Sequence, residues 1–489
     1  MIKKLYIVLL GLLCGACATH TQSLQERLEA DLPTYEAVGA KVMPEEIAPV
    51  KSPYFSYDFQ RPTFPERVDT LNPSLDKGLV QAHIDALAAA GGGTLVLTAG
   101  DYESGRIELK SNINLHLAEG AVLTFGSEIE DFLPVVFTRN EGIELYSLGA
   151  CIYAHDAENI AITGKGKLVG PGEGSVRKRI MTHDVIENIV DMDKPVAERI
   201  YDGSTTSFIF PPAFIAPINC KGVFIEGLSL ARTAFWNIVP TYCENVIIRG
   251  VQIHSEGIPR GDGIDIESSK NVLVEYCSLF TGDDCIAIKA GRSYDGLRIN
   301  KPSENIVVRY CLSGTGHGGL TLGSETAGMI KNLYVHDCAF DGTDVGIRFK
   351  TRRPRGGGGE NVTFENIRMH VKQSALRWDM LGSATHVGNQ ASRDFAVEVN
   401  ALTPEFSNIK IHNVLVESAE NCINVEGIPE STLKNVEISN LLATGENYLT
   451  LNDVDNFTIK DSEIHCVNCT VDSVHVSNFA TDQVKLVQQ

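Results

Sequence analysis

Two adjacent aspartates, Asp283 and Asp284, begin an apolar stretch that reads GDDCIAIK over residues 282–289. The letters after them are typical of a buried strand, and a charged pair at a strand end usually belongs to a solvated turn. A carboxyl group can also donate a proton, accept one or bind a cation. Which of these applies depends on the residues that the fold places above and below the pair.

A repeat that runs along most of the chain predicts what those neighbours are. An asparagine precedes a short alternating strand in segments such as CENVIIRGV, SKNVLVEYC and SENIVVRYC. No helical pattern links the strands, and repeats of this size built from short strands indicate a solenoid. The sequence therefore predicts an all-β fold, a right-handed parallel β-helix. The repeat asparagines are Asn159, Asn245, Asn271, Asn305, Asn332, Asn361, Asn408, Asn435 and Asn456.

Two further features fit this fold. Residues 76–90 carry apolar side chains at helical spacing and are followed by three glycines, which predicts a short N-terminal capping helix. Cys277, Cys311 and Cys338 each lie six residues after a repeat asparagine, where other repeats have Leu, Val or Ile. We expect these thiols to stack in the core rather than form disulfides. For Cys466 and Cys469 a disulfide, free thiols and, with His465, a metal site all remain open.

Four consecutive coils can be aligned by their inward apolar positions, Ile264, Ile286, Leu320 and Ile347. Adjacent coils of a sheet lie about 4.8 Å apart. The alignment places Asp262 over Asp284 and Asp283 over His317. It also places Arg348 and Lys350 two coils beyond the aspartates, with Lys289 in the same column as Lys350.

Three carboxyl groups at this spacing cannot all ionise easily, so one of them should have a raised pKa and hold a proton. A protonated carboxyl beside ionised ones is the arrangement that glycoside hydrolysis needs. A calcium site is the alternative for such a cluster. The cationic neighbours His317, Arg348 and Lys350 argue against it, because they would repel a metal ion.

The chain resembles the polygalacturonases of glycoside hydrolase family 28, whose motifs are Asn-Thr-Asp, Gly-x-Asp-Asp, Gly-His-Gly and Arg-Ile-Lys in this order. The corresponding segments here are Arg260-Gly261-Asp262, Gly282-Asp283-Asp284, Gly316-His317-Gly318 and Arg348-Phe349-Lys350. The resemblance extends over about residues 75–475. It implies inverting hydrolysis of α-linked galacturonate, with no metal and no other cofactor.

The resemblance also implies a role for each motif residue. Asp283 would be the general acid, and Asp262 and Asp284 would position and deprotonate the attacking water. His317 would tune the acid. Substrate-binding residues would be Arg348 and Lys350, to which we add Lys289. The amide of the first motif is missing, and we assign this departure to Gly261, which leaves the preferred sugar open.

The charge pattern points to an anionic sugar polymer. A formal net charge of −20 excludes nucleic acid and a broad anionic lipid surface as partners. Residues 348–355, RFKTRRPR, concentrate positive charge beside the aspartates, although Arg352, Arg353 and Arg355 are equally typical of a solvated turn. Residues 170–212, 291–304 and 370–405 interrupt the coils, and we expect them to close one end of a groove and favour exo attack.

Three alternatives remain open. A rhamnogalacturonan hydrolase would share the three aspartates, and the missing amide favours it. A pectate lyase would share the β-helix but needs calcium and a basic residue. A non-catalytic β-helical sugar-binding protein would need no cluster of carboxylates.

The N-terminus predicts export. Residues 1–17 combine two lysines, an apolar run and Gly15-Ala16-Cys17, which resembles a bacterial lipobox with Cys17 as the lipidated residue. We expect residues 18–60 to be a tether and lead-in, and residues 61–489 to form a single catalytic domain. The expected protein is a monomer in the periplasm or anchored to the outer membrane of a Gram-negative bacterium, bound to the membrane only through its lipid.

Overall fold

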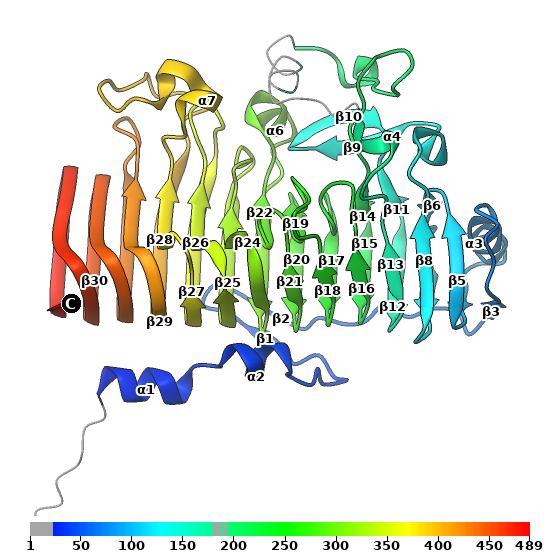
Figure 1. Ribbon diagram of the computed structural model, residues 1–489. Helices are drawn as coiled ribbons and strands as arrows, with labels where there is room; N and C mark the ends of the chain where they lie inside the picture. Colours follow the sequence, from blue (N-terminus) through cyan, green and yellow to red (C-terminus); the bar gives the residue numbers. More distant parts are fainter. Residues whose placement is uncertain (1–22, 179–185, 187–188, 190–192) are drawn as a thin grey trace, which may run out of the picture.

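The computed structural model describes residues 23–489 apart from 179–185, 187–188 and 190–192. Its strands wind into the predicted right-handed parallel β-helix, an elongated stack of coils (Figure 1). Residues 1–17, the predicted export signal with Cys17, lie outside the described residues. Within the described part, no helix has the length and apolar character needed to cross a membrane.

The coils have three faces, each a parallel stack of strands. The first face contains β3 (Val68–Leu71), β4 (Gly93–Leu97), β7 (Ile113–Leu117), β12 (Glu158–Gly164), β15 (Lys221–Glu226), β17 (Glu244–Arg249), β20 (Lys270–Glu275) and β23 (Ser303–Arg309). The second face contains β5 (Gly100–Ser104), β8 (Ala121–Phe125), β13 (Lys167–Val169), β16 (Ser229–Ala231), β18 (Gln252–His254) and β21 (Ser278–Phe280).

The third face contains β6 (Ile107–Glu108), β11 (Ala150–His155), β14 (Ala213–Ile218), β19 (Ile264–Glu267), β22 (Ile286–Lys289), β26 (Thr343–Lys350) and β28 (Ser374–Asp379). Long strands bend from one face to the next, namely β24 (Leu312–Leu322), β25 (Ile330–Asp341), β27 (Gly358–His370), β29 (Glu405–Glu426) and β30 (Leu433–Gln488).

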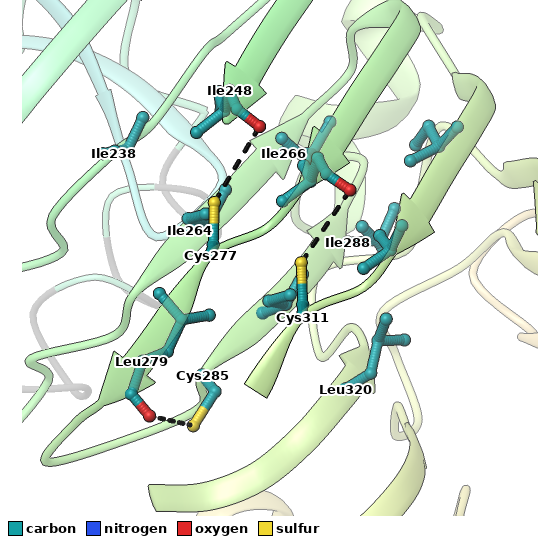
Figure 2. Packing of buried hydrophobic residues seen from close by; sticks show 14 of the residues in the cluster. Ile238, Ile248, Ile264, Ile266, Cys277, Leu279, Cys285, Ile288, Cys311 and Leu320 are labelled. Atoms are coloured by element: carbon teal, nitrogen blue, oxygen red, sulfur yellow. Dashed lines mark hydrogen bonds between the residues drawn. The ribbon is translucent and has the colours of Figure 1, made fainter. Parts of the chain in front are cut away.

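Inward apolar side chains fill the coils as columns. Ile264 pairs with Ile286, Ile286 with Leu320, and Leu320 with Ile347, which confirms the alignment made from the sequence. Cys277 and Cys311 are buried in the same core, as Figure 2 shows, and Cys338 pairs with Ile367. The predicted core role of the three thiols is confirmed. Cys466 and Cys469 form a disulfide.

The repeat asparagines form a hydrogen-bonded ladder along the first face. The Asn271 side chain donates to Asn245 at 3.3 Å and accepts from Asn305 at 3.2 Å. All three residues have a positive φ, a region that asparagine tolerates better than most residues. Each side-chain amide therefore hydrogen-bonds to the amide of a neighbouring coil, while the backbone of the same residue makes a sharp turn.

Helix α3 (Leu79–Ala89) closes the N-terminal end of the stack, as predicted (Figure 1). The helix begins directly after Gly78. Its Val80, Ile84 and Leu87 side chains are buried against the first coils. Covering this end keeps the apolar interior of the first coil from water.

The segment over residues 23–61, here called the strap, corrects the predicted tether. It contains α1 (Leu24–Asp31), α2 (Tyr35–Gly39) and the antiparallel pair β1 (Val50–Lys51) and β2 (Ser56–Tyr57), and it runs along the outside of the coils (Figure 1). Leu28 packs on Leu415 and Leu442, and Phe59 packs on apolar residues of the first face. Its buried positions are separated by polar residues, so the sequence showed no strand or core pattern.

Insertions between the coils gather on the side away from the strap (Figure 1). They contain the antiparallel hairpin β9 (Val136–Asn140) and β10 (Ile143–Ser147), and the short helices η1 (Ile129–Phe132), α4 (Ser175–Lys178), η2 (Val196–Glu198), α6 (Ser293–Ile299), α7 (Ala384–Val387) and η3 (Gly388–Ala391). They therefore stand beside the third face, where the predicted catalytic residues lie.

We predict that Asn271→Ala lowers the free energy of unfolding by about 2–3 kcal/mol, because it removes two ladder hydrogen bonds and places alanine at a positive φ. Asn271→Gly is the control, since glycine tolerates this backbone and loses only the hydrogen bonds. Denaturant unfolding measures both. Equal losses in the two variants would contradict the backbone part of this explanation.

Candidate active site

Three carboxyl groups meet where the third face begins. Asp262 precedes β19 by two residues, and Asp284 precedes β22 by two, so register alone stacks one over the other. Oxygen atoms of Asp262, Asp283 and Asp284 lie within 4.8 Å of one another. The spacing predicted from the sequence is thus observed.

Asp283 is the most accessible carboxyl group of the three. Its side chain is 22% exposed, and its Oδ1 lies 3.0 Å from Nδ1 of His317 on the next coil. The same oxygen accepts a hydrogen bond from the backbone N–H of Asp284. The His317 ring is itself half-exposed at the opening of the site.

Asp284 is buried and held by three groups from later coils. Its Oδ1 accepts a hydrogen bond from Thr321 Oγ1 at 2.9 Å and lies 3.4 Å from the Arg348 guanidinium. Its Oδ2 lies 3.7 Å from Lys350 Nζ. Arg348 and Lys350 therefore stand beside the aspartates, as the column alignment predicted.

Lys289 differs from the prediction. Its side chain is 5% exposed, and Nζ lies 3.3 Å from Glu325, 3.5 Å from Asp265 and 3.9 Å from Asp262. The ammonium also lies over the Trp236 ring, 4.5 Å from its centroid. The sequence alignment of the coils predicted the position of Lys289 along the stack. It could not show that Trp236 and Glu325 cover its side chain. This lysine is a buried counter-ion of the cluster rather than a group directed at a substrate.

The pKa values of Asp262 and Asp283 shift in opposite directions. Burial and the charge of Asp283 raise the pKa of Asp262 well above its usual value. Burial also raises the pKa of Asp283, but the hydrogen bond from His317 and the charges of Lys350 and Lys289 outweigh it and lower that pKa to about 2. The hydrogen bond to Asp283 in turn raises the pKa of His317. In the free enzyme these shifts favour a proton on Asp262 and on His317 over a proton on Asp283.

The three carboxylates are chemically able to ligate a hard cation, since oxygen is its preferred ligand. Three cationic side chains already lie within 4 Å of them, namely Lys289, Arg348 and Lys350. A metal ion would have to displace or face these charges. The donor set therefore fits proton transfer better than metal binding.

A cavity of about 250 Å³ is lined by the three aspartates, His317, Arg348 and Lys350. Its remaining lining residues are Glu141, Trp236, Arg260, Lys289, Arg292, Ser324, Glu325, Arg352 and His386. Glu141 comes from the β9–β10 hairpin, Arg292 from the loop before α6, and His386 from α7. The inserted segments thus contribute to the walls of the site.

The departure in the first motif needs a correction. Aligned letter by letter on Asn-Thr-Asp, Arg260 takes the place of the Asn, and Gly261 takes that of the Thr. A Cβ at Gly261 would lie 2.7 Å from the Ile258 carbonyl oxygen, so packing requires glycine there. The residue that replaces the amide in the cavity is Arg260.

Sequence reasoning missed several charged residues of the site. Glu325 and Glu141 form ion pairs with Arg292, at 3.2 Å and 2.9 Å, and no repeat or motif marks any of the three. Arg353 and Arg355 are buried rather than solvated, and Arg353 pairs with Glu430. A run of arginines beside a β-helix gives no signal of which ones turn inward.

Comparison with known proteins gives a family model and relatives that match this chain. The model of the family "Glycosyl hydrolases family 28" matches residues 201–376, the segment that contains all four motifs. A probable polygalacturonase of Vitis vinifera is 25% identical over 380 residues, 76% of this chain and 71% of that protein. An exo-poly-alpha-D-galacturonosidase of Dickeya chrysanthemi is 24% identical over 71% of this chain and 60% of its own length.

A solved structure gives the same result for the whole fold. The exopolygalacturonase of Thermotoga maritima superimposes with a TM-score of 0.72 and is 28% identical, with 88% of this chain and 94% of that one covered. The chain is a glycoside hydrolase, and over residues 201–376 it is similar to glycoside hydrolase family 28.

Proposed function

We propose that this enzyme is an exo-acting polygalacturonase that hydrolyses α-linked galacturonate with inversion. The observation that carries the proposal is the Asp283–His317 pair inside a carboxyl cluster that cations flank. The relatives named above are polygalacturonases, and the Thermotoga protein is an exopolygalacturonase, which supports the same substrate.

Local charge supports an anionic sugar. The whole chain carries a net charge of −20, yet Arg348, Lys350 and Arg352 line one cavity. Guanidinium and ammonium groups bind carboxylates through charge-assisted hydrogen bonds, which are among the stronger ones. In the proposed complex, Arg348 and Lys350 hold the carboxylate of one sugar beside the bond to be cleaved.

Binding of that carboxylate also changes the protonation of Asp283. The positive charge of Lys350 is one of the causes that lower the pKa of Asp283 in the free enzyme. A substrate carboxylate at Lys350 offsets this charge, so the pKa of Asp283 rises. The proton that His317 holds on the shared hydrogen bond then moves to Asp283, which donates it to the glycosidic oxygen.

Exposure separates the roles of the other two aspartates. Side chains of Asp262 and Asp284 are 4% and 1% exposed, so neither carboxylate reaches an anomeric carbon as a nucleophile. A water molecule held by both is the proposed nucleophile, with Asp284 as the base. The oxygens lie closer than the roughly 6.5–9.5 Å common in inverting enzymes. The proposal of inversion therefore rests on the burial of Asp262 and Asp284, and not on the distance between the carboxyl groups.

The inserted segments support attack at a chain end. Glu141, Arg292 and His386 come from three different insertions and line the same cavity as the aspartates. Walls of this kind limit how far a polymer can extend past the catalytic residues. A rhamnogalacturonan hydrolase is the second candidate, because it would share the three aspartates that line this cavity.

We also propose that residues 61–489 act as one catalytic domain, since one continuous sheet includes strands from β3 to β30. We propose export as a monomeric periplasmic or outer-membrane lipoprotein from the lipobox-like segment at Cys17. Incorporation of a labelled fatty acid, lost in Cys17→Ala, tests the anchor. An unlabelled wild-type protein would contradict it.

Product analysis tests the proposed reaction. With polygalacturonate, the purified enzyme should release saturated monomer or dimer from the first minutes, and proton NMR should show the inverted β-anomer first. Rhamnogalacturonan oligomers serve as the comparison substrate. Unsaturated ends would indicate a lyase, an α-anomer would indicate retention, and preferential cleavage of rhamnogalacturonan would favour the second candidate.

The pH dependence of kcat/KM tests the proton relay. The raised pKa of His317 means that the imidazolium is present below that pKa and is lost as the pH rises through it. Activity should therefore fall on the alkaline side at a pH above about 6.5. In His317→Gln the alkaline limb should move to lower pH, because only the carboxyl group of Asp283 then holds the proton.

Asp283→Asn is the control for this profile. It should lower kcat by about 10²–10⁴-fold at every pH, because the amide cannot donate the proton. Its unfolding transition should stay close to that of the wild type. An alkaline limb that does not move in His317→Gln would remove His317 from the relay.

A further inference from the structure

Arg260 is a cavity residue that the proposed reaction leaves without a role. Its side chain is 26% exposed, and its guanidinium lies 3.2 Å from Glu141 Oε1. The other oxygen of Glu141 lies 2.9 Å from Arg292. Two arginines therefore share one carboxylate at this wall of the site.

Arg260 and the pair Arg348–Lys350 lie on opposite sides of Asp283 along the stack. Along the stack, the coils follow in the order β19, β22, β24 and β26. Arg260 stands on the coil of β19, and Arg348 and Lys350 stand on β26. Three steps of about 4.8 Å separate these coils. Asp283 lies between them, on the coil of β22.

A further arginine increases the positive charge beside Arg260. Arg177 in α4 is half-buried, and burial together with the nearby charge of Arg260 lowers its pKa. The guanidinium groups of Arg177 and Arg260 repel each other, and an anion bound near them reduces this repulsion. The wall around Arg260 is therefore suited to a carboxylate.

We infer that Arg260 binds the carboxylate of the sugar on the opposite side of the scissile bond from the sugar that Arg348 and Lys350 hold. The inference rests on the proposed function. In a galacturonan every sugar carries a carboxylate, so both clusters are engaged across one bond. In an alternating galacturonate–rhamnose chain, one of the two sugars is neutral and leaves one cluster without its ligand. Arg260 is thus the residue that selects galacturonan.

Backbone geometry makes a clean substitution possible. Arg260 has a φ of 56°, a conformation that asparagine adopts more readily than arginine. Arg260→Asn also restores the residue type of the family motif. Glu141 keeps its ion pair with Arg292 in this variant. The unfolding free energy is measured beside the kinetics, so that a loss of activity in a folded variant can be assigned to the lost charge.

The chain offers a matched control in Arg232. This arginine also has a positive φ, 59°, and pairs with Glu173 at 2.8 Å, but its side chain is 59% exposed and does not line the cavity. Arg232→Asn should therefore leave the kinetics unchanged. Arg260→Lys should keep part of the activity, because it keeps the charge.

The test uses trigalacturonate and three derivatives, each with one carboxylate reduced to an alcohol. We expect Arg260→Asn to lower kcat/KM for trigalacturonate about 10- to 100-fold, mainly through KM, the size of a lost charge-assisted bond. The wild type should discriminate against a derivative that lacks the carboxylate bound by Arg260. In the variant, this derivative and the parent should be cleaved equally well.

The inference is overturned if Arg260→Asn keeps the wild-type discrimination against every derivative, or if it slows all four substrates by the same factor. A wild-type enzyme that does not cleave trigalacturonate at all would instead contradict the proposed function, and the inference with it.

Discussion

Adjacent coils of a parallel β-helix must stay in register about 4.8 Å apart, and the site depends on this constraint. The register that pairs Ile264 with Ile286 and Ile286 with Leu320 also fixes the polar residues just before each strand. No loop has to fold back to bring the carboxyl groups together. The same spacing places several carboxyl groups close together. The fold must therefore place cationic side chains beside them to offset the repulsion.

Lys289 is the main element of that compensation. Its buried ammonium lies within 4 Å of Asp262, Asp265 and Glu325, while Arg348 and Lys350 face Asp284 from a later coil. A buried ammonium costs several kcal/mol in lost hydration unless anions surround it, as they do here. Charge balance also decides where protons reside: the more buried Asp262 keeps one, and the more exposed Asp283 releases its own to His317.

The fold and the catalytic column could be predicted because both depend on periodicity. Inward residues recur with each coil, and the asparagines mark the turns, so the position of Asp262 over Asp284 follows from counting. The walls could not be predicted in this way. Glu141 and His386 reach the cavity from a hairpin and a short helix whose paths no repeat determines. The burial of Lys289 and the ionised state of Asp283 depend on neighbours from several coils, and no single stretch of sequence contains them.

The strap changes how the solenoid can come apart. Coils that contact only their neighbours can fray one at a time from an end, as in a one-dimensional array. Here Tyr35 donates to Glu417, Arg309 donates to the Ala48 carbonyl, and Arg249 donates to the Pro44 carbonyl, so one segment is fastened to coils far apart in the stack. Loosening a late coil also loosens the strap over earlier ones. The array is thereby converted into a cooperative unit, and the coils that carry the aspartates share the stability of the whole stack.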